Sequence, residues 1–168
     1  MNPDGIYFIS FATVQRINVF TRRCYKDILV ESINYCIATK GLIVYAWVIM
    51  SNHIHLLIQK NEEPLECIVR NLKKFSAKVI LKEVSENQQE SRKEWMLRIF
   101  EQVGKKNSNN AHYQFWQHHN QPIELSANHE IGQTIDYIHN NPVLAGFVNN
   151  PEGYPYSSAT DFVGKKGW

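Results

Sequence analysis

Two histidines, His53 and His55, stand one residue apart within the apolar run 48–58. Isoleucine, leucine and valine dominate this run, which favours a β-strand over a helix. In a strand, residues i and i+2 point to the same face, so the two imidazoles would lie side by side while Ile54 points into a core. Two imidazoles on one rigid face form half of a metal site. The alternative is a pair of hydrogen-bonded surface histidines, and the spacing alone leaves both interpretations open.

A candidate nucleophile, Tyr137, lies in segment 136–142, Asp-Tyr-Ile-His-Asn-Asn-Pro. On a helix, residues i and i+4 share a face, so Tyr137 and Asn141 would point the same way. An amide oxygen is an acceptable ligand for a hard ion such as Mg²⁺ or Mn²⁺. Asn-Pro is also common at a helix boundary, so taken alone this segment favours a buried tyrosine followed by a capping asparagine.

Together, segments 46–55 and 136–148 resemble a known family. The first, Ala-Trp-Val-Ile-Met-Ser-Asn-His-Ile-His, is similar to the His-hydrophobic-His motif of the HUH endonucleases. The second, Asp-Tyr-Ile-His-Asn-Asn-Pro-Val-Leu-Ala-Gly-Phe-Val, resembles the tyrosine motif of the single-tyrosine transposases in that superfamily. With the Tyr-Pro-Tyr-Ser-Ser sequence at 154–158, it resembles in particular the REP-associated branch of the IS200-like tyrosine transposases.

The resemblance implies a set of functional residues. It implies that His53 and His55 hold a divalent ion, Mg²⁺ or Mn²⁺, with Asn141 as third ligand and Tyr137 as the nucleophile. It further implies cleavage of single-stranded DNA beside a hairpin, with a covalent 5′-phosphotyrosine and a free 3′-hydroxyl. Insertion-sequence relatives build such a site across a dimer, whereas REP-associated relatives work as monomers, so both a monomer and a homodimer stay open.

This chemistry suits the residue types. A divalent ion acts as a Lewis acid on the anionic scissile phosphate and orients it. A covalent tyrosine intermediate keeps the bond energy that rejoining requires, so a tyrosine nucleophile suits strand transfer better than hydrolysis. Two other functions stay open: a hairpin-binding regulator without turnover, and a hydrolase of small phosphate esters with a structural Tyr137.

Basic and aromatic residues supply candidate DNA contacts. Several lysines and arginines recur along one predicted helix or precede another, as a stripe that follows a phosphate backbone would. Aromatic residues near the last strand would stack on unpaired bases. The alternatives are a solvated helix face and ordinary core aromatics. The candidates are Arg22, Arg23, Lys73, Lys74, Lys78 and Trp116.

The composition is that of an ordinary globular protein. The chain has 168 residues, 43% of them hydrophobic, and a net charge of +2, which is too small to indicate nucleic-acid binding by itself. This length suits a single domain, residues 1–168. The three cysteines show no CxxC spacing and predict reduced thiols. With no secretion leader and no run long enough to span a bilayer, we expect a cytoplasmic protein without membrane contact.

The pattern of elements predicts an α+β fold, in which helices pack on an antiparallel sheet as in the ferredoxin-like HUH endonuclease sandwich. A hairpin turn is expected at Ser51-Asn52, a helix cap at Asp27, and a helix break at Asn141-Pro142. Gly-Lys-Lys-Asn-Ser-Asn-Asn at 104–110 predicts a flexible loop. The expected strands are 6–15, 42–50, 53–59 and 113–117, and the expected helices are 27–40, 64–86, 94–103, 128–140 and a short piece at 142–147.

Overall fold

The computed structural model describes the whole chain except residues 1, 3, 62, 108–111, 119 and 165–168. Four antiparallel strands form one sheet in the order β2-β3-β1-β4. The strands are β1 (Ile6–Ala12), β2 (Leu42–Ile49), β3 (His53–Lys60) and β4 (Ile123–Leu125). The helices are α1 (Arg23–Lys40), α2 (Leu65–Glu86), α3 (Lys93–Lys105), α4 (Asn128–Leu144) and α5 (Ala159–Phe162), with 3-10 turns η1 (Val14–Arg16), η2 (Val19–Thr21) and η3 (Pro151–Gly153). The predicted α+β fold is confirmed.

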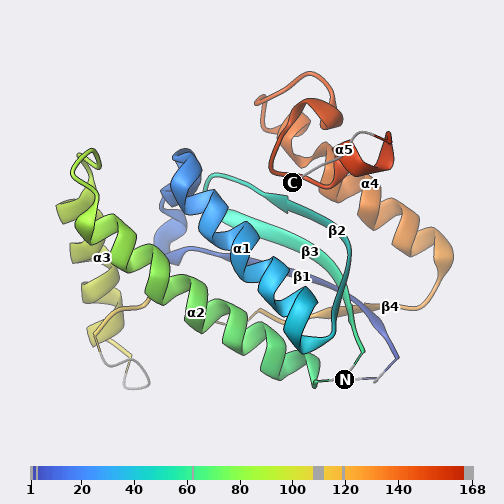
Figure 1. The fold of residues 1–168 in the computed structure, drawn as a ribbon, viewed down its shortest axis with the longest axis horizontal. Helices are drawn as coiled ribbons and strands as arrows, with labels where there is room; N and C mark the ends of the chain where they lie inside the picture. The colour runs from blue at the N-terminus through green and yellow to red at the C-terminus, as the bar shows by residue number, and fades with distance from the viewer. Residues whose placement is uncertain (1, 3, 62, 108–111, 119, 165–168) are drawn as a thin grey trace.

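Different helices lie against the two faces of the sheet. Helices α1 and α2 run side by side across one face, and α4 with the C-terminal segment lies apart from them (Figure 1). Side chains of β1 alternate between these faces. Phe11 points toward α2, because its ring lies under the Lys73 ammonium, whereas Phe8 points toward α4, because it contacts the Tyr137 ring. The α4 face of β1 and β3 is therefore where the predicted site residues meet.

The hairpin predicted at Ser51-Asn52 is confirmed. Met50 N–H donates to the His53 carbonyl at 2.8 Å, which brings the end of β2 against the start of β3. Ile54 is fully buried, as its alternation with the two histidines predicts. Strand β3 lies between β2 and β1, so its backbone is held on both sides and both histidines stand on a rigid element.

Helix α1 begins four residues before the predicted cap at Asp27, so that prediction was wrong. Asp27 instead lies within the helix. Its side chain accepts a hydrogen bond from Tyr156 Oη at 2.7 Å and forms an ion pair with Arg23 at 3.7 Å. The end of the helix was predicted correctly. Gly41 follows it with a left-handed φ of 66°, which glycine adopts without steric cost.

The strand predicted at 113–117 is also wrong. Among the described residues of this segment, Trp116 makes only an isolated bridge to Thr13, and the fourth strand lies at Ile123–Leu125. Phe115 and Trp116 are both buried although they are neighbours in sequence, so the aromatic run reflects a loop packed into the core. Strand β1 likewise ends at Ala12, before the predicted end at residue 15, because η1 begins at Val14.

The predicted break at Asn141-Pro142 does not occur, because α4 continues through Pro142 to Leu144. A proline lacks the N–H that would bond to the carbonyl four residues earlier, here that of Ile138. The loss is confined to that bond, since Ala145 N–H still donates to the Asn141 carbonyl at 3.0 Å and Phe147 N–H to the Pro142 carbonyl at 2.9 Å. The helical piece predicted at 142–147 is the last turn of α4.

The predicted loop at 104–110 and the absence of a membrane span were the two remaining expectations. Helix α3 extends to Lys105, so the flexible loop predicted at 104–110 begins later than expected, and residues 108–110 of it lie outside the described residues. Over the part of the chain that the structure describes, every helix is too short or too polar to cross a lipid bilayer.

Candidate active site

The two histidines lie side by side on the α4 face of β3. His53 stands opposite Ala12 and His55 opposite Ser10 on the neighbouring strand β1. Their ring centroids are 4.8 Å apart, and His55 is buried with 6% of its surface exposed. The alternation of a strand thus places both imidazoles as the sequence predicts.

Helix α4 brings a tyrosine and an asparagine to these histidines. Its core-facing stripe of Ile131, Ile135, Ile138 and Pro142 is wholly or partly buried, which fixes the rotation of the helix on the sheet. One turn of the helix beside this stripe carries Tyr137 and Asn141. The Tyr137 ring centroid lies 5.3 Å from that of His55, and the Asn141 side chain lies near enough to His53 to raise its pKa.

Phe8 completes the floor of the site. Its ring stacks on the His55 ring with centroids 5.5 Å apart and meets the edge of the Tyr137 ring at 6.0 Å. Tyr137 itself is 47% exposed. The phenol is therefore supported from below and open to a ligand from solvent. Phe8 is not among the site residues predicted from the sequence. The usable signal is the alternation along the first predicted strand, which puts every second side chain on one face.

The surroundings of the histidines keep both rings neutral. Burial, followed by the charges of His53 and Arg16, lowers the pKa of His55 to about 3. Burial also lowers the pKa of His53, with Arg16 adding to the effect and the Asn141 side chain opposing it. A neutral imidazole offers a lone pair to a metal ion, whereas a protonated one does not.

The ring nitrogens of both imidazoles are compatible with a metal site, although within the described structure only the His53 ring has a hydrogen bond. His53 Nδ1 lies 2.7 Å from Asn52 Oδ1, so Nδ1 carries the proton and Nε2 keeps its lone pair. His55 Nδ1 is buried without a hydrogen-bond partner among the described residues. No three His, Cys, Asp or Glu side chains cluster in the described part of the chain, so the candidate ligands remain the two imidazoles and the predicted Asn141 amide. These residues fit a divalent ion.

A hydrogen-bonded clasp holds α4 against the edge of the sheet. His139 Nε2 lies 2.9 Å from Ser158 Oγ. Ser158 in turn makes two hydrogen bonds with the backbone of Trp47 on β2. Trp47 N–H donates to Ser158 Oγ at 2.9 Å, and Ser158 N–H donates to the Trp47 carbonyl at 3.0 Å. We did not predict this clasp from the sequence. The signal was the Tyr-Pro-Tyr-Ser-Ser tail, whose last serine supplies it.

Comparison with known families decides the identity. The family model described as "Transposase IS200 like" matches residues 4–100, which are 97 of the 168 residues. The chain belongs to the IS200-like transposase family. As a transposase it is an enzyme that acts on DNA. The matched range includes His53 and His55 and ends before Tyr137, so the family model does not bear on the tyrosine helix.

Solved structures are similar to this transposase in fold. The structure of a REP-associated tyrosine transposase bound to a REP hairpin superposes with a TM-score of 0.68 at 16% identity, covering 99% of this chain and 83% of that chain. A putative transposase from Deinococcus radiodurans R1 gives a TM-score of 0.46 at 20% identity, covering 80% of this chain and 88% of that one. No sequence among the curated proteins matches. The first likeness shows that the chain shares the α+β fold of that structure, an antiparallel sheet with helices packed on it.

Three of the DNA-contact candidates have structural partners in the transposase. Arg22 Nε donates to the buried Glu90 at 2.8 Å; burial would raise the pKa of Glu90, but Arg92 and then Arg22 hold it at about 2. Trp116 is 5% exposed and donates from Nε1 to Ser76 Oγ at 3.3 Å. These two side chains are components of the fold, and a base has no access to the Trp116 ring.

Lys73 joins α2 to the segment that precedes β4. Its Nζ donates to the Gln117 carbonyl at 3.0 Å and to Asn120 Oδ1, and it lies 5.7 Å from the centre of the Phe11 ring. Burial lowers the pKa of Lys73 to about 8. An ammonium that is partly buried and already bonded is a poor contact for a phosphate.

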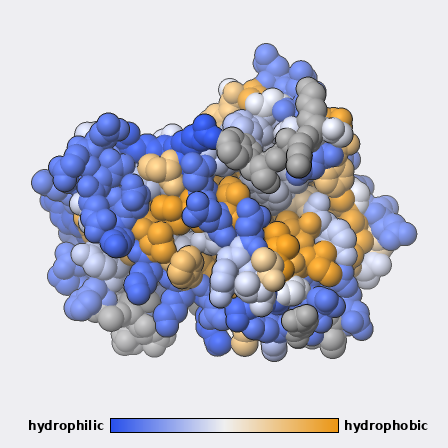
Figure 2. Space-filling view, in the orientation of Figure 1, coloured by the Kyte–Doolittle hydropathy of each residue, from blue (hydrophilic) through white to orange (hydrophobic). Residues whose placement is uncertain are grey.

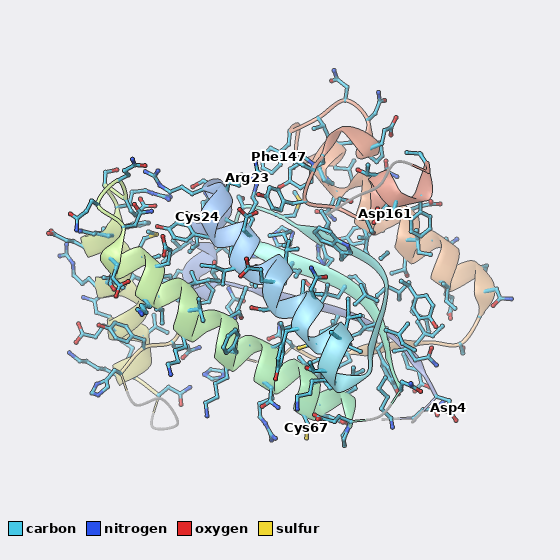
Figure 3. All side chains as sticks on the ribbon, in the orientation of Figure 1. Asp4, Arg23, Cys24, Cys67, Phe147 and Asp161 are labelled. Carbon is cyan, nitrogen blue, oxygen red and sulfur yellow. The ribbon has the colours of Figure 1, made fainter. Side chains whose placement is uncertain are left out.

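Arg23, Lys74 and Lys78 remain exposed on the transposase surface. Lys74 and Lys78 line both a groove of about 1010 Å³ beside segment 112–122 and a groove of about 740 Å³ between α1 and α2. Hydrophobic and hydrophilic residues mix on the face formed by α1 and α2 (Figure 2). Arg23 stands at the start of α1, at the same end of the molecule as Phe147, which follows α4 (Figure 3). The candidates therefore lie on two separate parts of the surface.

Proposed function

We propose that this transposase is a metal-dependent single-stranded DNA endonuclease and strand transferase that acts beside DNA hairpins. The observation that carries the proposal is the meeting of α4 with β3, where Tyr137 contacts His55 and Asn141 lies beside His53. A nucleophile, two neutral imidazoles and an amide come together at one point. Cleavage of a phosphodiester through a covalent intermediate can use a nucleophile of this kind beside a metal ion held by such ligands.

His53, His55 and Asn141 would hold the ion, Mg²⁺ or Mn²⁺. A divalent ion bound there supplies Lewis-acid stabilisation of the charge that develops on the scissile phosphate. The protein's own contribution is preorganisation. Asn52 fixes the ring of His53, Phe8 supports the ring of His55, and the clasp at the edge of the sheet fixes the helix that carries the tyrosine.

In the proposed cleavage step, Tyr137 Oη attacks the scissile phosphorus and the P–O3′ bond breaks. The phenol gives up its proton, the leaving O3′ takes one up, and the 5′-phosphate stays bonded to Tyr137. Rejoining is the reverse, in which a 3′-hydroxyl attacks the phosphotyrosine and the phenol leaves. Each step exchanges one phosphoester bond for another, so strand transfer needs no external energy source.

We propose single-stranded or hairpin DNA as the substrate and a monomer as the active form. The REP hairpin bound to a structural relative supports this substrate. The presence of all site residues in one chain supports the monomer. Arg23, Lys74 and Lys78 are the proposed phosphate contacts. We also propose that residues 1–168 form one domain, because one core cluster runs from Tyr7 to Tyr156.

The test is a denaturing gel with 3′-labelled single-stranded hairpin oligonucleotides from the flanks of the protein's own gene, in Mg²⁺ or Mn²⁺. The 5′-phosphotyrosine keeps the 3′-labelled product on the protein, whereas a 5′-labelled strand is released as a shorter free fragment. We expect the labelled protein band from the wild type and from Tyr35→Phe, an exposed tyrosine of α1. Tyr137→Phe and His55→Ala should give none.

Two outcomes would replace the proposal. Hairpin binding on a native gel without any protein-linked label would favour a DNA-binding regulator on the same fold. Neither binding nor cleavage, with activity on a small phosphate ester that survives in Tyr137→Phe, would favour a hydrolase in which the tyrosine is structural.

A further inference from the structure

The turn after β1 adopts a conformation that its residues do not favour. Gln15 and Arg16 both have a φ of 51°, and among the described residues they are the only non-glycine residues with a positive φ. The left-handed region costs an ordinary L-residue energy and is usually occupied by glycine or asparagine. Such conformations persist where the surroundings enforce them, and they concentrate at functional sites.

Asn52 enforces this turn and connects it to the candidate active site. Its Nδ2 donates to the Arg16 carbonyl at 3.0 Å and to Asn18 Oδ1 at 3.1 Å, while its Oδ1 lies 2.7 Å from His53 Nδ1. Thr13 Oγ1 donates to the Asn52 carbonyl at 3.2 Å, which ties the other end of the turn to the same residue. One side chain therefore holds both the histidine ring and the backbone that carries Arg16.

Arg16 lies next to the histidine pair, because its carbonyl and His53 Nδ1 both bond to the side chain of Asn52. Arg16 is exposed, and within the described part of the chain no carboxylate pairs with it. A cation beside two metal-binding imidazoles would oppose a divalent ion. An anion between them removes that repulsion.

We propose that Arg16 is a phosphate-binding residue of the active site and contacts the scissile phosphate of the DNA. The inference rests on the proposed cleavage function and adds to it a residue outside the histidine and tyrosine motifs. A guanidinium presents several N–H donors in a plane and matches two oxygens of one phosphate, which an ammonium does not. The energetic cost of the turn is explained if it holds this fork at a fixed place beside the metal ligands.

The test compares Arg16→Asn with Arg16→Lys in the full chain. Asparagine tolerates the left-handed turn and removes the charge, whereas lysine keeps the charge and removes the fork. We expect the rate of adduct formation on the 3′-labelled hairpin oligonucleotide to fall about 100-fold or more in Arg16→Asn and less in Arg16→Lys. Arg98→Gln, an exposed arginine of α3, is the matched control and should keep the wild-type rate.

A second readout does not require cleavage. In a Tyr137→Phe background, hairpin affinity is measured by fluorescence anisotropy at several salt concentrations. Loss of one phosphate contact should reduce the slope of log K against log salt by about 0.7 in Arg16→Asn. Unchanged thermal unfolding of Arg16→Asn, with Arg16→Gly as the alternative if it unfolds, separates this loss from collapse of the turn.

The outcomes separate the two proposals. A wild-type adduct rate and an unchanged salt slope in Arg16→Asn would overturn the role of Arg16 and leave the cleavage proposal intact. No adduct from the wild type would overturn cleavage, while the salt slope would still decide whether Arg16 binds a phosphate. No hairpin binding by the wild type at low salt would overturn both.

Discussion

The ring of Tyr137 lies with its centroid 5.3 Å from the ring of His55, and both residues belong to the same chain. This contact depends on the docking of α4 on its own sheet. The buried Ile138 and Pro142 fix the helix from below, and the bond from His139 to Ser158 fixes it at the edge of β2. In this arrangement the tyrosine helix packs on the sheet of its own chain.

We therefore expect Tyr137→Phe and His55→Ala not to complement each other. When the two inactive variants are mixed, each site still lacks one of its groups, so no protein-linked label should form. If the tyrosine helix were exchanged between subunits, half of the molecules would be mixed dimers with one intact site each. The mixture would then show about a quarter of the wild-type adduct. The measurement is the denaturing gel, after mixing the proteins under conditions that allow subunits to exchange.

Asn52 should control metal affinity without touching the metal. In Asn52→Ala, His53 loses the partner that fixes its ring, and partners that hold histidine ligands typically contribute 10–100-fold to affinity. We expect Mn²⁺ affinity, measured by isothermal titration, to fall by about that factor. Asn34→Ala, an exposed asparagine of α1, should bind Mn²⁺ like the wild type. Equal affinities in both variants would show that Asn52 does not orient the ring.

The parts of the fold that the sequence predicts well depend on local periodicity. Alternation along β3 correctly places His53, His55 and the buried Ile54 because a strand has a fixed period of two. The spacing of Tyr137 and Asn141 likewise predicts that they share a helical face, and both reach the histidine pair. In each case the backbone alone decides which way the side chain points.

The parts that the sequence predicts poorly depend on tertiary contacts. The aromatic segment around Trp116 has the composition of a strand, but its burial comes from Phe11 and Phe20, which are distant in sequence. Pro142 predicts a broken helix, but its position in the last turn limits the loss to one bond. Neither the partner of Arg22 nor that of His139 is visible from local spacing, since Glu90 and Ser158 come from other elements.

Substitutions at Trp116 and Lys78 should affect different properties: the first should lower stability, and the second should weaken DNA binding. Trp116→Phe loses a buried hydrogen bond and core volume, so the free energy of unfolding should fall by about 1–3 kcal/mol. Hairpin affinity should not change, because the ring is not accessible. Lys78→Gln should leave stability unchanged and reduce the salt slope of binding by about 0.7. Urea denaturation and anisotropy titrations measure the two effects, and the opposite pattern would restore Trp116 as a base-stacking residue.

A substitution in the turn that carries Arg16 should raise the free energy of unfolding without reducing the adduct rate. In Gln15→Gly the left-handed conformation no longer costs steric energy, although glycine loses more chain entropy on folding. The expected net result is a stabilisation of up to about 1 kcal/mol with an unchanged adduct rate. Gln102→Gly, within the right-handed helix α3, should instead destabilise by about 1 kcal/mol. Thermal denaturation of both variants is the measurement, and destabilisation by both would mean that Gln15 makes a stabilising contact through its side chain.

Acid should destabilise the metal-free protein through His55. Its pKa is about 3 in the folded state, chiefly because of burial, and about 6.5 in an unfolded chain. Between these values the unfolded state binds the extra proton, so the stabilisation present at neutral pH is lost as pH falls below about 6.5. The loss from one such group reaches about 1.4 kcal/mol per pH unit.

His55→Phe isolates this contribution, because it keeps an aromatic ring against Phe8 and removes the titration. In EDTA, urea denaturation at pH 7, 6, 5 and 4 should show a steeper loss of stability for the wild type than for the variant. Groups that do not interact with His55, such as His139, titrate equally in both proteins and cancel in the difference. Parallel curves would mean that His55 becomes protonated in the folded state near its ordinary pKa, so that its ring is open to water and less suited to hold a metal ion.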